Sequence, residues 1–176
     1  MEGILQVFFL NNFNFFGETK RSISIKQKGE VHMIEQDTIK LLRECDAGIK
    51  MGVKSIGDVL PYVSSRQLKQ MLEECKRRHE KLAEEVEAAL DRFQDDGKEP
   101  NVMAEAMSWL KTNMKLTLDE SDATIADLMT DGCNMGAKSL RRYLNQYEAA
   151  DEEAKDIAKR LTAMEEQLTE EMRPFL

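Results

Sequence analysis

The chain is poor in the residues that break helices or cross-link a fold. Its 176 residues include three prolines, three cysteines and two histidines, and the cysteines form no CxxC pair. So few cysteines make no disulfide framework and are typical of the reducing cytoplasm, where we expect this protein. No apolar run reaches the roughly 18 residues that a membrane helix needs, so we expect no membrane partner. The net charge of −8 argues against nucleic acid, because phosphate binding needs a basic face.

Charged and helix-forming residues dominate what is present. The charged fraction is 33%, and Lys, Glu, Ala, Leu and Met prevail from Met33 onward. From Asp37 apolar residues recur at helical spacing, as in the row Leu42, Ile49 and Ile56. A chain of this length forms one domain with a buried core. The sequence therefore predicts an all-α domain over residues 33–176.

Residues 1–32 differ in composition from that domain. The stretch from Val7 to Phe16 is rich in Phe and Asn, and it lacks the basic start and cleavage site of a signal peptide. The codons for residues 28–30 can contain a ribosome-binding sequence at a normal distance before Met33. We expect a poorly folded leader that results from a mis-called translation start. The alternative is a short sticky arm or a β-hairpin that packs on the domain.

The periodic segments divide into five expected helices. They cover residues 37–60, 65–93, 101–116, 121–147 and 151–173. Short connections make the first two and the last two antiparallel hairpins. The longer connection between the hairpins carries the helix over 101–116. The sequence thus predicts a four-helix bundle with the order hairpin, crossover, hairpin and an additional helix in the crossover.

Two local signals refine the first hairpin. Ser64 and Gln67 have the spacing of a capping box, which predicts Ser64 as the N-cap of the second helix. Gly48, Gly52 and Gly57 would each weaken an isolated helix by about 1 kcal/mol. We therefore expect these glycines to let a neighbouring helix approach closely.

Several short segments resemble a known group of proteins. Residues 125–129 read Ile-Ala-Asp-Leu-Met, residues 132–136 read Gly-Cys-Asn-Met-Gly, and residues 48–52 read Gly-Ile-Lys-Met-Gly. Together with the ending over 163–176, these are similar to ferritin-like proteins of low-GC bacteria. The resemblance covers about residues 37–176. It implies a bacterial, ferritin-like four-helix bundle of an uncharacterised family, and it implies fold far more than function.

The ligands of a di-iron centre are missing. Metal-binding ferritin-like proteins use a Glu from each of two helices and Glu-x-x-His from the other two. Here Lys76 occupies the Glu position before His79, the helix over 151–173 has no His, and Cys133 stands where a carboxylate would be needed. The sequence therefore predicts no ferroxidase or di-iron oxidase.

Four polar residues nevertheless fall on the inward stripes of the helices: Asp46, Cys75, His79 and Cys133. With the first turn centred near residues 62–63, Asp46 and His79 each lie about 16 residues from it, roughly 25 Å at 1.5 Å per residue. Three interpretations stay open. In the first, Asp46 and His79 form a buried pair and the cysteines pack as small hydrophobic residues. In the second, the four residues bind Zn or Fe. In the third, Cys75 and Cys133 form a thiol-redox pair.

No complete catalytic constellation accompanies these residues. Adjacent acidic pairs such as Glu165 and Glu166 are interpreted as solvated charges. The expected function is that of a structural or protein-interaction module without enzymatic activity or cofactor, and the alternative is a small metal-binding or thiol-redox bundle. Self-association is a further hypothesis, because the last helix ends in the apolar residues Met172, Phe175 and Leu176.

Overall fold

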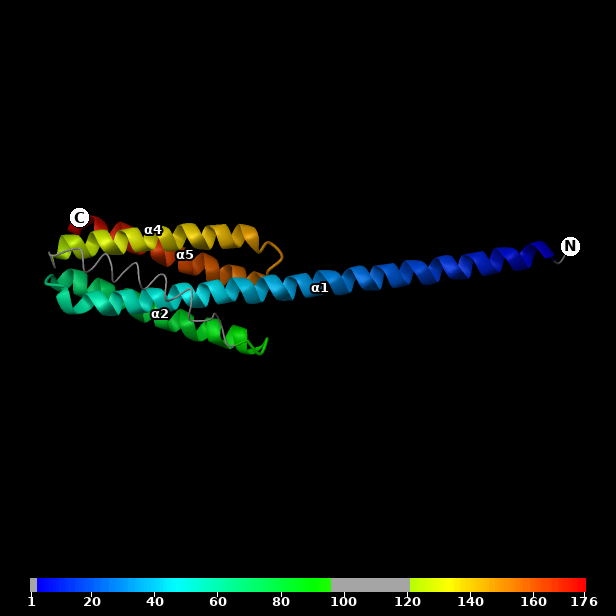
Figure 1. Ribbon diagram of the computed structural model, residues 1–176, viewed down its shortest axis with the longest axis horizontal. Helices are drawn as coiled ribbons and strands as arrows, with labels where there is room; N and C mark the ends of the chain where they lie inside the picture. The colour runs from blue at the N-terminus through cyan, green and yellow to red at the C-terminus, as the bar shows by residue number, and fades with distance from the viewer. Residues whose placement is uncertain (1–2, 96–120) are drawn as a thin grey trace.

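The computed structural model describes the backbone of residues 3–95 and 121–176, and side chains from residue 29 onward. Figure 1 shows the helices of these ranges. They are α1 (Gly3–Val59), α2 (Arg66–Asp91), α4 (Asp122–Gln146) and α5 (Glu152–Met172), with the 3-10 turns η1 (Leu60–Tyr62) and η2 (Arg173–Phe175). The expected all-α class is confirmed for the described residues. The helix expected over 101–116 lies outside them.

Helix α1 begins far earlier than the expected residue 37. It runs without interruption from Gly3, so its first half projects beyond the other helices in Figure 1. The first proline of the chain is Pro61, and without a proline nothing in residues 3–36 forces the helix to end. The segment interpreted as a poorly folded leader or a β-hairpin is therefore helical from residue 3. The start of the native chain at Met33 stays a prediction.

Side-chain caps start the three later helices. The N-cap of α2 is Ser65, whose hydroxyl accepts from Leu68 N at 3.3 Å, so the prediction of Ser64 was wrong by one residue. The reason is that η1 and an extended segment follow α1 and delay the start of α2. Ser121 caps α4 and Asp151 caps α5 in the same way. Each cap satisfies a backbone donor that the helix itself leaves unpaired.

One carboxylate shows how the two hairpins are joined. The oxygens of Asp122, at the start of α4, accept from Ser64 N and Ser65 N, both at 2.8 Å. The N-termini of α2 and α4 therefore lie at the same end of the bundle, and these two helices run parallel. At the opposite end, the backbone N–H of Asp151 donates to Thr38 Oγ1 at 2.9 Å. Residues 95 and 121 accordingly lie at opposite ends of the bundle.

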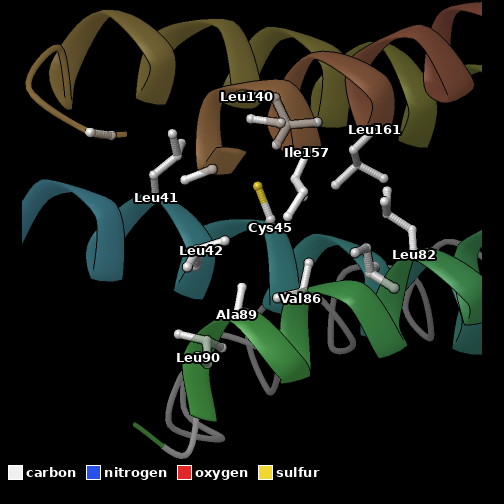
Figure 2. Close-up of a cluster of buried hydrophobic side chains, with 14 of the residues drawn as sticks. Leu41, Leu42, Cys45, Leu82, Val86, Ala89, Leu90, Leu140, Ile157 and Leu161 are labelled. Atoms are coloured by element: carbon white, nitrogen blue, oxygen red, sulfur yellow. The ribbon is translucent and has the colours of Figure 1, made fainter. Parts of the chain in front are cut away.

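The buried side chains form two apolar clusters, one at each end of the bundle. α1 and α5 each pack against all three other helices. Figure 2 shows the first cluster, in which Leu41, Cys45 and Val86 meet Leu140 and Ile157. The second cluster is built around residues that include Ile56, Leu72, Ala126, Met129, Leu168 and Met172. The level between the clusters holds the polar residues described below.

Two surface expectations can be compared with this packing. Met172 is fully buried and Phe175 is partly buried against the second cluster, so the end of α5 presents only Leu176 as an exposed apolar side chain. The apolar patch on which the self-association hypothesis rested is therefore absent there. Among the residues that the structure describes, no helix is long and apolar enough to cross a membrane.

The Asp122 bridge can be tested by substitution. Asp122→Ala should lower the free energy of unfolding by about 1–3 kcal/mol, because two backbone N–H groups lose a charged acceptor. Asp127→Ala is the matched control: Asp127 is exposed on the same helix, and its loss should change stability by less than about 0.5 kcal/mol. Urea unfolding followed by circular dichroism measures both. Equal effects of the two substitutions would contradict the bridge.

Candidate functional site

The polar layer consists of Cys75, His79, Cys133 and Glu165 and lies where the two apolar clusters meet, with Cys75 and Cys133 also part of the second cluster. His79 from α2 is 1% exposed and Glu165 from α5 is 9% exposed. His79 Nε2 lies 3.3 Å from Glu165 Oε1, so the pair joins the two hairpins through the middle of the bundle. Cys75 lies one turn before His79 on α2, and Cys133 faces Glu165 from α4.

The contacts of His79 fix the number of protons in this pair. Its Nδ1 lies 2.9 Å from the carbonyl oxygen of Cys75. A carbonyl can only accept, so Nδ1 carries a hydrogen and donates it. One proton must then lie between Nε2 and the carboxylate, since two acceptors facing each other in the core would repel. The pair is therefore either an imidazolium with a carboxylate or a neutral imidazole with a protonated Glu165.

The pKa of His79 favours the charged form of the ring. Burial alone would lower this pKa, because it disfavours the imidazolium. The hydrogen bonds with Cys75 and Glu165, together with the negative charge of Glu165, outweigh burial and raise the pKa of His79 from 6.5 to about 10. The ring is thus positively charged at neutral pH and neutralises Glu165.

Two glycines make room for the pair. A Cβ on Gly52 of α1 would lie 3.0 Å from both Cδ2 and Nε2 of the His79 ring. On the opposite side, a Cβ on Gly136 of α4 would lie 3.4 Å from Cδ of Glu165. The expectation that glycines permit close approach is confirmed at Gly52, although the neighbour is a side chain. Gly57 has no atom within 4 Å of such a Cβ, so the expectation fails there.

Cys45 and Cys133 are buried thiols with little tendency to ionise. Burial raises the pKa of Cys133, and the charge and hydrogen bond of Glu165 raise it further. Burial, with the charges of Glu44 and Asp46, raises the pKa of Cys45 to about 12. A reactive thiol needs the opposite shift, toward a stable thiolate. The thiol-redox interpretation therefore has no electrostatic basis at Cys133.

Asp46 does not belong to the polar layer. Its carboxylate accepts from Lys50 Nζ at 2.7 Å, one turn along α1, so the expected Asp46–His79 pair is wrong. The residue of α1 level with His79 is Gly52, about 9 Å further along the helix at 1.5 Å per residue. Counting residues from the first turn gave the wrong level for Asp46, because η1 continues after α1 and the chain reverses at residues 63–65 instead of 62–63.

Glu165 is the member that the sequence analysis missed. It was interpreted as a solvated charge beside Glu166, whereas the structure buries it against His79. A signal was present: Leu161, Glu165 and Leu168 are spaced four and three residues apart, the spacing of one helix face. The buried His79 also required an acidic partner, and Glu165 meets that requirement.

The polar layer does not have the geometry of a metal centre. Within residues 29–95 and 121–176, no three side chains among His, Cys, Asp and Glu are arranged to hold a metal ion. The predicted ligand set of Asp46, Cys75, His79 and Cys133 is split, because Asp46 pairs with Lys50. The remaining three are engaged with one another and with Glu165.

A groove of about 260 Å³ runs along the bundle beside the polar layer, between α1 and α4. One wall is α1 from Glu44 to Ser55, and the other is α4 from Leu128 to Tyr143. Glu165 also lines the groove, so one side of the polar layer faces it.

The glycines of the two motif segments all lie in this groove. Gly48 and Gly52 line it from α1, and Gly132 and Gly136 line it from α4. Gly132 has open space where a Cβ would be. Residues from the segments 48–52 and 132–136 therefore line the same groove.

Comparisons of the chain with protein families, with curated proteins and with solved structures find no match.

The His79–Glu165 pair predicts a pH dependence of stability. The folded pKa of His79 is above its unfolded value of 6.5, so the folded state binds the proton more tightly. The stabilisation is complete below pH 6.5 and is lost as the pH rises toward about 10. The free energy of unfolding should fall between pH 6.5 and about 7.5, by at most about 1.4 kcal/mol per pH unit.

Urea unfolding across this range measures the slope. Glu165 and Cys75 face the ring, and Cys133 faces Glu165. Stopping near pH 7.5, about one pH unit below the ordinary pKa of a thiol, keeps ionisation of the cysteines in the unfolded chain out of the slope. His79→Gln should remove most of the slope. His32→Gln removes the other histidine, which is exposed, and should leave the slope unchanged. A slope that survives in His79→Gln would contradict the assignment.

The close contact at Gly52 predicts an unusual response to alanine. Gly52→Ala should destabilise the fold by about 1–3 kcal/mol, because the new methyl group meets a ring that is bonded at both nitrogens and cannot move aside. Gly57→Ala, in the same helix with open space, should instead stabilise it by up to about 1 kcal/mol. Thermal unfolding distinguishes the two signs, and stabilisation by both would show that the ring can move.

Proposed function

We propose that this chain is a ferritin-like helical bundle without a di-iron centre, and that it works as a non-enzymatic binding module in the bacterial cytoplasm. The observation that carries the proposal is the polar layer. At the level where a ferritin-like bundle would hold metal, the described side chains satisfy one another through the His79–Glu165 pair.

The wiring of the bundle supports the ferritin-like part of the proposal. α2 and α4 run parallel, as Asp122 indicates, so two antiparallel hairpins are joined by one long crossover. That order is typical of ferritin-like bundles and differs from a simple up-and-down bundle, in which neighbours in sequence alternate in direction.

The binding part of the proposal rests on the groove between α1 and α4. The polar layer has no free nucleophile and no ionised thiol at Cys133 with which to carry out a reaction. The groove, by contrast, is a concave apolar surface beside a few polar groups, which is how binding sites for other molecules are built. We therefore assign the function to the groove and give the polar layer a positioning role.

Elemental analysis tests the proposal against its metal-binding alternative. The full chain is purified without chelator and without an affinity tag, and zinc and iron are measured per chain. We expect far less than one equivalent of either metal, with no difference between the native protein and His79→Ala. About one equivalent that is lost in His79→Ala, but kept in the surface variant His32→Ala, would support a metal-binding bundle instead.

A further inference from the structure

The outer side of α4 carries charges that are sorted by sign along the helix. Asp127 and Asp131 are exposed in its first half, and Lys138 and Arg142 are exposed in its second half. At 3.6 residues per turn, these four side chains and Met135 fall within an arc of roughly 80°. They form one stripe along the helix, which we call the α4 face.

The α4 face is unfavourable in a single chain. Asp127 and Asp131 are four residues apart, as are Lys138 and Arg142, and like charges at this spacing on a helix repel each other. Within the part of the chain that the structure describes, none of these four side chains takes part in an ion pair. Arg142 lies over the ring of Tyr143, with its guanidinium carbon 5.3 Å from the ring centroid. A single chain thus leaves the charges of this face without opposite partners.

The other helices arrange their surface charges differently. On α1, α2 and α5, opposite charges lie three or four residues apart and pair along the helix. Examples are Lys50 with Asp46, Lys76 with Glu80, and Lys155 with Glu152. The separation of charge on α4 is therefore a property of this helix and not of the whole surface.

The helix dipole does not account for the separation. A dipole favours acidic residues at the start of a helix and basic residues at its end, but the effect falls off within the first and last turns. Asp131 and Lys138 are the tenth and the seventeenth of the 25 residues of α4, so both lie well inside it. Another chain is needed to supply their opposite charges.

The charges of the α4 face are symmetric about its midpoint, which lies between residues 134 and 135. Asp131 and Lys138 lie on either side of it, each at about 3.5 residues or roughly 5 Å along the axis. Asp127 and Arg142 form the outer pair, each roughly 11 Å from the midpoint. Two antiparallel copies of α4, related by a two-fold axis at the midpoint, therefore place every acidic residue level with a basic residue of the other copy.

An exposed apolar side chain lies at this midpoint. Met135 is 55% exposed, and in α2, α4 and α5, which the structure describes in full, it is the only large apolar side chain that is exposed. A two-fold axis beside residue 135 would bring the two Met135 side chains together and remove both from water. Methionine is flexible enough to pack against its own copy across such an axis.

From the sorted charges, their symmetry and the apolar midpoint, we infer that two copies of this chain associate through the α4 face. The two α4 helices run antiparallel, with Asp131 opposite the partner's Lys138 and Asp127 opposite the partner's Arg142. Each of these contacts occurs twice in the dimer. The inference goes beyond the proposed function and does not depend on it, because the α4 face can pair whether or not the groove is occupied.

Sedimentation equilibrium of the full chain tests the association. We expect a reversible dimer with a dissociation constant on the order of 10–100 μM, because one pair of helices makes a small contact. Raising the NaCl concentration from about 0.05 M to about 0.5 M should weaken the dimer about tenfold, since salt screens exposed charges.

Reversal of single charges locates the interface. Asp131→Lys and Lys138→Asp should each weaken the dimer about tenfold or more, because two attractive contacts become repulsive in each case. Glu87→Lys is the matched control for Asp131→Lys: Glu87 is exposed on α2, and the change in net charge is the same. It should alter the dissociation constant by less than about twofold. Circular dichroism confirms that each variant remains helical.

A mixture of the two variants tests the antiparallel register. Asp131→Lys carries two basic residues at the inner positions and Lys138→Asp carries two acidic ones, so an antiparallel pair of unlike variants has only attractive inner contacts. An equimolar mixture should therefore dimerise about as tightly as the native chain, although each variant alone does not. The double variant Asp131→Lys/Lys138→Asp should also regain native affinity.

Three results would overturn the inference. A full chain that stays monomeric up to about 1 mM at low salt would exclude the dimer, since that is at least tenfold above the expected dissociation constant. A dimer that Asp131→Lys leaves unchanged, or that Glu87→Lys weakens equally, would place the contact elsewhere. Failure of the two variants to dimerise with each other would exclude the antiparallel register. Each of these results leaves the proposed function standing, because metal content tests that proposal separately.

Discussion

The bundle depends on one buried contact, the pair between His79 and Glu165. Either residue alone would leave a charged or polar group in the core without a partner, at a cost of roughly 3–5 kcal/mol. Together they share a proton, and the Cys75 carbonyl satisfies the remaining ring nitrogen. Because the pair links α2 to α5, the two hairpins must meet in one arrangement. Gly52 and Gly136 are small because this pair occupies the space beside them.

Much of the fold could be predicted from the sequence because helical periodicity is a local property. The apolar rows, the caps at Ser121 and Asp151, and the short connections are read over a few residues at a time. The failures occurred where a longer range mattered. Nothing local shows that a helix continues through residues 3–36, and the 3-10 turn after Val59 moved the reversal from residues 62–63 to residues 63–65.

The site was predicted only in part, for a geometrical reason. Residues Cys75, His79 and Cys133 were placed inward correctly, since each lies on an apolar stripe. The acidic partner of His79 was misassigned. Its level was found by counting residues from the turn, so any error in the position of the turn changes which residues are predicted to be level. Asp46 was chosen where Gly52 stands, and Glu165 was overlooked although it lies on the same face as Leu161 and Leu168. The acidic side chain that contacts a buried histidine is determined by the register between helices, which the sequence of one helix does not specify.

The same pair has a consequence for how the chain selects its register. Each hairpin can close through contacts near in sequence, whereas the polar contact joins residues 86 positions apart and forms only when the hairpins dock. A slip of one helical turn would set His79 against Leu161 or Leu168, apolar side chains that cannot accept its hydrogen. Two uniformly apolar faces would tolerate such a slip. The polar layer thus specifies the register in which the two hairpins dock. A bundle in another register would leave His79 without an acceptor, a cost that hydrophobic burial alone does not impose.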